Sequence, residues 1–305
     1  MKIGLIDVDG HNFPNLPLMK LSAWHKSQGD TVEWYQQIIH NELNCNPFDK
    51  VYMSKVFTFT PDYQYPVNAV EVIKGGTGYF YPDGGLTLPY EIEHIYPDYD
   101  LYGIQNTAYG FMTRGCPRKC DFCVVGCKEG VISHKVSDLS GFWRGQKYIE
   151  LMDPNLLACK DHKELLLQLI HSKAKVNMNQ GVDCRLLTED NINLLKQVKL
   201  SKIHFAWDNI TDREKVVPKL KLYKYLTNCD MRKTIVYVLT NFNSTHEEDL
   251  ERVYTIRTLG MSPYIMIYNK DKLSKKHITR KLARWVNNRF IWYKDLNSKF
   301  EGYTV

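Results

Sequence analysis

The sequence predicts an α/β protein: a small Rossmann-like parallel sheet, then a partial (β/α)6 barrel of the TIM type, then a basic C-terminal helix. Two observations predict this order. Short apolar runs typical of buried strands alternate with segments of helical period along most of the chain. A stretch rich in Pro, Gly and Tyr, residues 81–103, separates a first series of strands from a second and is predicted to be a linker. The 305 residues, 44% of them apolar, suffice for both cores.

The first series predicts the small sheet, in a domain of residues 1–95. One helix is expected at residues 16–28, ended by Gly29. Because helices are fewer than in a full doubly wound domain, we expect a shortened Rossmann-like unit. The expected strands are residues 2–8, 31–35, 50–55 and 69–76.

The second series predicts the barrel, in a domain of residues 96–275. A strand just before Cys116 opens it, and six βα units follow from the pattern. Functional side chains of such barrels gather at the carboxyl ends of the strands. The other expected strands are residues 147–153, 175–181, 202–208, 234–240 and 263–269, and the expected helices are residues 162–173, 188–198 and 246–260.

Positive charge is concentrated near the C-terminus. The formal net charge is +6, and residues 270–294 carry nine Lys or Arg against one Asp, so the rest of the chain is close to neutral. Residues 276–305 are therefore predicted to be a basic helix and tail. Apolar residues near helical spacing predict that this helix packs against the barrel: Ile278, Leu282, Trp285, Val286 and Phe290.

The sequence does not decide what, if anything, this basic stretch binds. A charged, solvated face is the commoner explanation of such a run. Basic residues interleaved with Trp285, Trp292 and Tyr293 are also compatible with gripping phosphates and stacking on bases. An acidic peptide or a phosphorylated small molecule fits the charge equally well.

Composition excludes a membrane protein and a disulfide-rich secreted protein. No apolar run approaches the length needed to cross a bilayer, and the opening residues read as a strand rather than a secretion signal. We therefore expect a cytoplasmic protein, in which eight cysteines do not form a disulfide framework. The scattered cysteines are expected to be small buried apolar side chains: Cys45, Cys159, Cys184 and Cys229.

The other four cysteines lie together in "GCPRKCDFCVVGC", residues 115–127. Cysteine thiolates bind zinc or iron-sulfur clusters, so the spacing must decide. Structural zinc usually takes two separated pairs, and no second pair follows here. Three closely spaced cysteines can hold three corners of a cubane cluster and leave one iron open to a substrate or cofactor. The spacing favours the cluster.

The pattern Cys116-x-x-x-Cys120-x-Phe122-Cys123 resembles the signature loop of the radical S-adenosylmethionine (SAM) superfamily. The resemblance implies that these three cysteines hold a 4Fe-4S cluster whose open iron chelates SAM. It also implies reductive cleavage of SAM to a 5'-deoxyadenosyl radical, with a reductant such as flavodoxin or ferredoxin as partner. The substrate, whether small molecule, peptide or RNA, is not identified. Cys127 is expected to stay free, because a fourth thiolate would close the open iron.

The resemblance extends to five residues that it implies contact SAM. Asp153 lies where the family contacts the amino group, although "DPN" replaces the Gly-Gly-Glu form of many members. Gln180 and Arg185 correspond to positions that hold the methionine end, and an arginine fork suits a carboxylate. Asp208 corresponds to a ribose contact, and Phe122 would lie along the adenine.

The first domain resembles the cobalamin-binding-like domain found at the N-terminus of one branch of this superfamily. The hallmark of that domain is Asp-x-His-x-x-Gly, and this chain has Asp9, His11 and then Pro14 in the glycine position. Ser54 and the glycines at 75–76 echo later elements. Because the domain is short, a degenerate relic or a substrate lid is favoured over a cobalamin site. Methyl or other group transfer is the reaction that this resemblance suggests.

A function of another class is also compatible with the sequence. The cysteine loop of a non-catalytic metal-binding protein would hold zinc or an inert iron-sulfur cluster, and its basic tail would bind nucleic acid.

Overall fold

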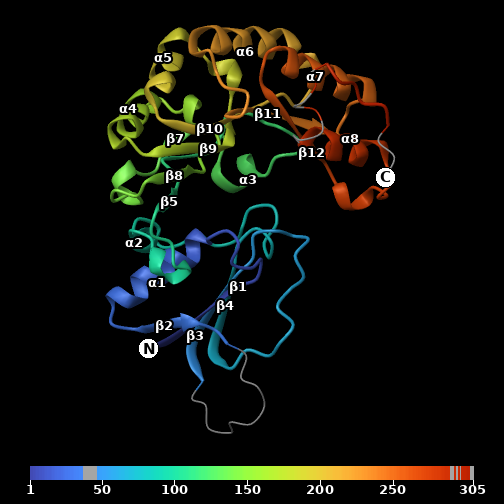
Figure 1. Cartoon of the computed structure of the whole chain (residues 1–305). Coiled ribbons are helices and arrows are strands. Elements are labelled where there is room, and N and C mark those ends of the chain that lie inside the picture. Colours follow the sequence, from blue (N-terminus) through green and yellow to red (C-terminus); the bar gives the residue numbers. More distant parts are fainter. Residues whose placement is uncertain (37–46, 289–291, 293–294, 296, 303–305) are drawn as a thin grey trace.

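The computed structural model describes residues 1–36, 47–288, 292, 295 and 297–302, and two parallel sheets dominate it (Figure 1). The smaller sheet has the strand order β2-β1-β3-β4, and the larger has the order β12-β11-β10-β9-β8-β5. A short antiparallel ribbon joins β6 to β7. The predicted α/β class with parallel sheets is confirmed.

The smaller sheet contains each element that the sequence predicted for it. Asn15 begins the helix, because its side chain accepts a hydrogen bond from the Leu18 amide at 3.3 Å. On one face of the sheet, apolar residues of this helix and of β1 pack together. Tyr63 and Val67, from the loop between β3 and β4, cover the opposite face. The elements are β1 (Lys2–Asp7), α1 (Leu16–Ser27), β2 (Thr31–Trp34), β3 (Phe48–Ser54) and β4 (Ala69–Gly75).

Residues 81–103 are a packed connection, so the predicted linker is wrong. They contain α2 (Tyr90–Glu93) and η1 (Tyr99–Tyr102). The buried Tyr99 hydroxyl donates to the Phe142 carbonyl at 2.7 Å and accepts from the Tyr109 amide at 3.0 Å. Leu16 of α1 belongs to the same core as the larger sheet. The two sheets are therefore connected through a shared core, which the polar and glycine-rich composition of the segment hid.

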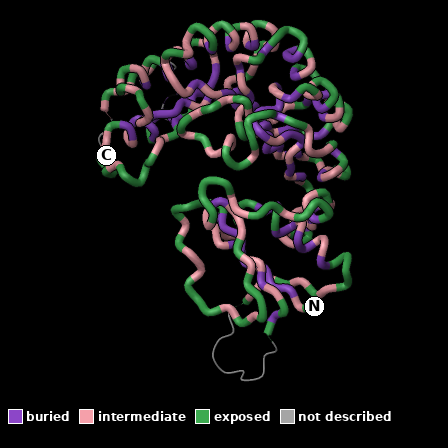
Figure 2. Tube along the Cα trace, turned by 180° about the vertical axis from the view of Figure 1, so that it is seen from behind, coloured by how far each residue is buried: buried purple, intermediate pink, exposed green. Residues whose placement is uncertain are grey.

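The larger sheet presents one face to the helices α4 to α8, which follow it as an arc in Figure 1, and Figure 2 shows buried residues along its strands. In the described residues β5 and β12 pair with one neighbour each, so the sheet is open. Its strands are β5 (Thr107–Gly110), β8 (Tyr148–Leu151), β9 (Lys175–Val182), β10 (Leu200–Ala206), β11 (Thr234–Thr240) and β12 (Ser262–Ile267). Its longer helices are α4 (His162–Ser172), α5 (Glu189–Gln197), α6 (Arg213–Thr227), α7 (His246–Thr258) and α8 (Ile278–Asn287).

Helix α6 is an element that the sequence analysis did not place. It contains Pro218, a residue that usually ends or kinks a helix. Val216, Leu220 and Tyr223 are buried in the main core. Tertiary packing therefore outweighs the local preference.

Helix α8 packs its apolar side chains against β12, as the sequence predicted for part of that set. Leu282, Trp285 and Val286 form a core cluster with Ile265, whereas Ile278 is 39% exposed. Trp292 belongs to the same cluster and has no exposed surface. Trp285 and Trp292 are thus not free to stack on nucleic-acid bases. Phe290 and Tyr293 lie outside the described residues.

The scattered cysteines mostly follow their prediction. Cys159 and Cys184 are buried, Cys229 is half-buried, and Cys45 lies outside the described residues. None of the helices in the described part of the chain combines the length and apolar composition that a bilayer crossing requires. The domain boundaries at residues 95 and 275 stay a prediction.

A buried arginine on α7 ties the ends of two central strands together. The Arg252 side chain has no exposed surface and donates to the carbonyls of Trp207 at 2.9 Å, Asp208 at 2.7 Å and Leu239 at 2.9 Å. Its charge is balanced by a hydrogen-bonded ion pair with the buried Asp249. Arg252 therefore fixes the carboxyl ends of β10 and β11, where the chain turns toward the candidate site.

Replacing this arginine should destabilise the whole fold. Arg252→Leu removes the donor of three carbonyls and the cationic partner of Asp249, which keeps only its hydrogen bond from the Ser244 hydroxyl. Breaking a buried pair costs about 3–5 kcal/mol. Urea unfolding followed by circular dichroism measures the change. Arg213→Leu, which removes an exposed pair with Glu251, is the matched control and should cost less than about 1 kcal/mol. Equal losses in the two variants would contradict the role of Arg252.

Candidate functional site

The cysteine loop lies at the carboxyl end of β5, held at its base by the ribbon of β6 (Thr113–Arg114) and β7 (His134–Lys135). The Cys116 amide donates to the Gly130 carbonyl at 3.1 Å, which closes the loop across the short helix α3 (Val125–Glu129). Gly115 has φ +79°, and an added Cβ would lie 2.2 Å from the Ile132 carbonyl oxygen. Glycine is therefore required immediately before the first cysteine.

The three predicted ligand cysteines are free thiols within electrostatic range of one another. Cys116 and Cys120 are half-buried, and Cys123 is exposed. Burial raises the pKa of Cys120 to about 11, with a smaller opposing effect of Arg118 and smaller contributions from Asp208 and the other two thiols. Burial also raises the pKa of Cys123. Thiols with raised pKa values are poor nucleophiles, but a bound metal ion readily deprotonates them.

The sequence left zinc and an iron-sulfur cluster open as groups that these thiols could hold. Within the part of the chain that the structure describes, no group of three or more His, Cys, Asp or Glu side chains is placed to hold one ion. Zinc needs its ligands in one tetrahedron, at about 2.3 Å from the metal for sulfur. A cubane cluster instead takes each cysteine at a different corner, so its ligands stand farther apart. Three thiolates spaced closely along one loop are a donor set that suits three corners of such a cluster.

Cys127, the fourth cysteine of the loop, is exposed on α3 and is a free thiol. That Cys127 is not a ligand of a cluster stays a prediction.

Asn155 contacts the first cysteine directly. Its Nδ2 atom donates to Cys116 Sγ at 3.3 Å, and the Ser133 hydroxyl donates to the Asn155 carbonyl at 3.0 Å. The Oδ1 atom of Asn155 is buried without a hydrogen-bond partner in the structure. Asn155 belongs to the "DPN" segment at a strand end where the sequence predicts polar site residues, but its contact with a cysteine was not predicted.

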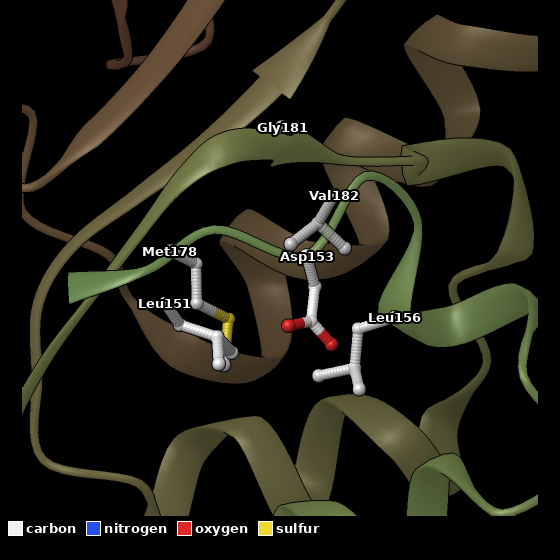
Figure 3. A pocket seen from close by; sticks show the side chains of 6 residues that line it. All are labelled: Leu151, Asp153, Leu156, Met178, Gly181 and Val182. Atoms are coloured by element: carbon white, nitrogen blue, oxygen red, sulfur yellow. The ribbon is translucent and has the colours of Figure 1, made fainter. Parts of the chain in front are cut away.

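Asp153 holds the backbone that leads into the cysteine loop. Its carboxylate accepts hydrogen bonds from the amides of Met112 at 2.8 Å and Thr113 at 2.9 Å, and from the Thr113 hydroxyl at 2.6 Å. In Figure 3 this carboxylate lies among the side chains of Leu156 and Val182. Burial raises its pKa to about 7, although the three hydrogen bonds oppose the shift. The predicted contact of Asp153 with SAM stays a prediction.

Arg185 is paired with carboxylates of two loops. Its Nε atom donates to Asp183 at 2.7 Å, and its guanidinium reaches Asp212 at 3.2 Å. Arg118 of the cysteine loop lies 3.7 Å from the same Asp212 carboxylate. Asp212 thus joins the cysteine loop to the loops after β9 and β10. Neither Arg118 nor Asp212 was predicted from the sequence to be a site residue. The position of Arg118 inside the cysteine motif could have indicated that it lies at the site.

The remaining predicted residues differ in their surroundings. Burial raises the pKa of Asp208, and the nearby Arg118 opposes this shift. Phe122 makes an edge-on contact with Phe242 of the loop after β11, with ring centroids 5.4 Å apart. Gln180 is exposed on β9. The structure therefore brings Asp208 close to the cysteine loop and places Phe122 of that loop against Phe242, whereas Gln180 makes no side-chain hydrogen bond within the described residues.

His11, the residue that resembles a cobalt ligand, lies against aromatic rings. Its ring centroid is 4.2 Å from that of Trp34 and 5.7 Å from that of Tyr102. At the end of β1, the Asp9 carboxylate accepts hydrogen bonds from the Phe57 amide and the Thr60 hydroxyl, so the loop after β3 closes over the point where a doubly wound sheet binds its ligand. Whether this domain binds cobalamin stays a prediction.

No described protein family and no curated protein matches this chain. Among solved structures it is similar to the crystal structure of SuiB from Streptococcus suis bound to S-adenosylmethionine, with 12% identity, a TM-score of 0.43, and coverage of 62% of this chain and 44% of SuiB. SuiB bound to its precursor peptide SuiA gives 11% identity, a TM-score of 0.45, and coverage of 62% and 47%. The chain spans less than half the length of SuiB, and a likeness of this extent carries no argument about function.

The raised pKa of Asp153 makes stability depend on pH. The folded protein binds this proton up to about pH 7, whereas an unfolded Asp releases it near pH 4. The contribution of the protonated Asp153 to the free energy of unfolding is therefore fully present below about pH 4. It is lost as the pH rises to about 7. We expect the free energy of unfolding of the unchanged protein to fall over this range relative to Asp153→Asn, as measured by urea unfolding at several pH values. Asp190→Asn, at an exposed carboxylate, controls for the substitution, and a parallel pH profile for Asp153→Asn would contradict the assignment.

Proposed function

We propose that this chain is a radical SAM enzyme in which Cys116, Cys120 and Cys123 hold a 4Fe-4S cluster. The observation that carries the proposal is the cysteine loop itself. Three free thiols with the Cys-x-x-x-Cys-x-x-Cys spacing lie at the carboxyl end of the first strand of a six-stranded parallel sheet. Cys127, exposed on α3, would stay unbound, so that the fourth corner of the cluster is open to SAM.

The cofactors would supply the reactive chemistry: when bound and reduced, the cluster and SAM yield a 5'-deoxyadenosyl radical that abstracts hydrogen from an organic substrate. The protein's task is to position them. Asp153 holds the backbone at Met112 and Thr113, and Asn155 orients Cys116 through its hydrogen bond to Sγ. These contacts keep the loop in a fixed place relative to the sheet.

The charged residues beside the loop suit the mixed charges of SAM. The SAM carboxylate would take the place of the Asp212 carboxylate as the partner of the Arg185 guanidinium, since two carboxylates are alike in charge and geometry. Its amino and sulfonium groups favour the negative charges of Asp183 and Asp208, and Asp208 is also the expected ribose contact. Phe122 would lie along the adenine.

The finer points of the function are likewise proposals. Gln180 and Asp153 keep their predicted contacts with the methionine part of SAM, and the electron comes from a reductant such as flavodoxin or ferredoxin in the cytoplasm. The smaller sheet serves as a lid beside the substrate rather than as a cobalamin carrier. Methyl or other group transfer is the reaction class that we favour.

Two cysteine variants test the proposal. The anaerobically reconstituted protein should be brown, hold about four irons per chain, and form 5'-deoxyadenosine from SAM and a reductant. Cys120→Ala should lose both iron and this activity, because one corner of the cluster loses its ligand. Cys127→Ala, the matched control from the same loop, should keep both.

Two results would overturn the proposal. One is a colourless, zinc-loaded protein, which fits the non-catalytic alternative. The other is loss of the cluster from Cys127→Ala, because Cys127 would then be a fourth ligand and SAM would have no open iron.

The hydrogen bond from Asn155 to Cys116 should tune the cluster. A donor to a ligand sulfur stabilises the more negative, reduced state. Asn155→Ala should therefore shift the reduction potential to more negative values in a titration followed by electron paramagnetic resonance. Asn193→Ala, at an exposed site on α5, is the control, and an unchanged potential in Asn155→Ala would show that the contact has no electronic role.

A further inference from the structure

The face of the larger sheet that turns away from the helices, which we call the inner face, carries polar and aromatic side chains. On β8 and β9, alternate residues pack into the core: Ile149, Leu151, Val176 and Met178. Because successive side chains of a strand point to opposite faces, Glu150, Asn177 and Asn179 belong to the inner face. Glu150 and Asn177 are direct neighbours in the pairing of the two strands.

Glu150 gathers two asparagine side chains around one of its oxygens. The Nδ2 atoms of Asn177 and Asn179 donate to Glu150 Oε2 at 2.6 Å and 3.3 Å. These donations fix the orientation of both amides, so each Oδ1 points elsewhere. Both Oδ1 atoms are buried and have no hydrogen-bond partner in the structure. A buried acceptor left unpaired costs about 1–3 kcal/mol, so a donor that reached these atoms when the amides turn toward it would offset that cost.

The Glu150 carboxylate accepts its hydrogen bonds from the neutral amides of Asn177 and Asn179, and the nearest cationic residue on the neighbouring strand is Lys202, the ladder partner of Asn177. Burial raises the pKa of Glu150, the two asparagines oppose the shift, and Lys202 of β10 opposes it from a distance. Lys202 is exposed. A ligand with its own positive charge would thus gain both hydrogen bonds and charge pairing at this place.

Aromatic side chains flank the acceptors on both sides. Tyr109 of β5 is the ladder partner of Glu150, and its ring meets Phe13 of the first domain edge-on, with centroids 5.2 Å apart. Tyr237 of β11 donates its hydroxyl hydrogen to the Asn179 carbonyl at 2.9 Å, and its ring stacks on His204 at 5.0 Å. Ring faces attract cations.

We propose that Glu150, Asn177 and Asn179 bind the cationic end, a guanidinium or ammonium group, of an organic substrate between Tyr109 and Tyr237. A guanidinium carries five donors and an ammonium three, which match an acceptor-rich group. An anionic end would be repelled by Glu150, and a neutral hydroxyl offers a single donor. That this ligand is the substrate rests on the proposed function; the binding itself requires no cluster.

Three small probes test the inference by isothermal titration calorimetry. We expect n-butylguanidine or n-butylamine to bind at least roughly tenfold more tightly than the neutral n-butylurea, and the ratio of the two cations tells guanidinium from ammonium. Glu150→Gln should abolish the preference for the cations, provided that its thermal unfolding matches that of the unchanged protein.

Lys202→Met should change the affinity for cations in the opposite direction to Glu150→Gln. Lys202 is exposed and repels a cation near Glu150, so its removal should tighten binding of the cations and leave n-butylurea unaffected. Equal binding of the cations and n-butylurea would overturn the inference, as would cation binding that neither Glu150→Gln nor Lys202→Met alters.

The failure of this inference can be told from the failure of the proposed function. Cleavage of SAM by the unchanged protein is measured in the same preparation. Charge-selective binding without SAM cleavage would overturn the radical SAM proposal alone. SAM cleavage without charge-selective binding would overturn the cation site alone.

Discussion

One buried carboxylate decides where the cysteine loop sits. Asp153, at the carboxyl end of β8, accepts hydrogen bonds from the backbone amides of Met112 and Thr113, just before the loop begins. Two residues farther on, Asn155 reaches the sulfur of Cys116. Because one strand end fixes both the base of the loop and its first thiol, the position of any group that the cysteines hold follows from the sheet.

Charged side chains form two groups near this carboxylate, one at the strand ends and one farther along the strands, which we call the first and the second level. At the strand ends, Arg118 and Arg185 share the Asp212 carboxylate, so positive and negative groups alternate beside the thiols. Farther along the strands, Glu150 and its asparagines form a group of acceptors. The first level suits a zwitterionic cofactor and the second a cation. The buried Arg252 holds the carboxyl ends of β10 and β11 together.

Predictions from the sequence succeeded where a pattern is local and failed where a distant partner decides. The strands of both sheets follow their apolar runs closely, since a buried strand needs such a run. Residues 81–103 resembled a linker because their composition is that of turns, yet Tyr99 is a core residue. Helix α6 forms around Pro218 because its buried face packs on the core. The sequence allowed Trp285 to stack on bases, but in the structure α8 packs this side chain into the core.

The sequence by itself determined the order of the elements and the spacing of Cys116, Cys120 and Cys123, because both are written in neighbouring residues. Only the tertiary structure decided which side chains meet that loop. Asn155 contacts Cys116 across 39 positions of chain, and Arg118 approaches Asp212 from a different loop. Strand pairing and helix packing create these contacts, and no local period encodes which partner a polar side chain will find.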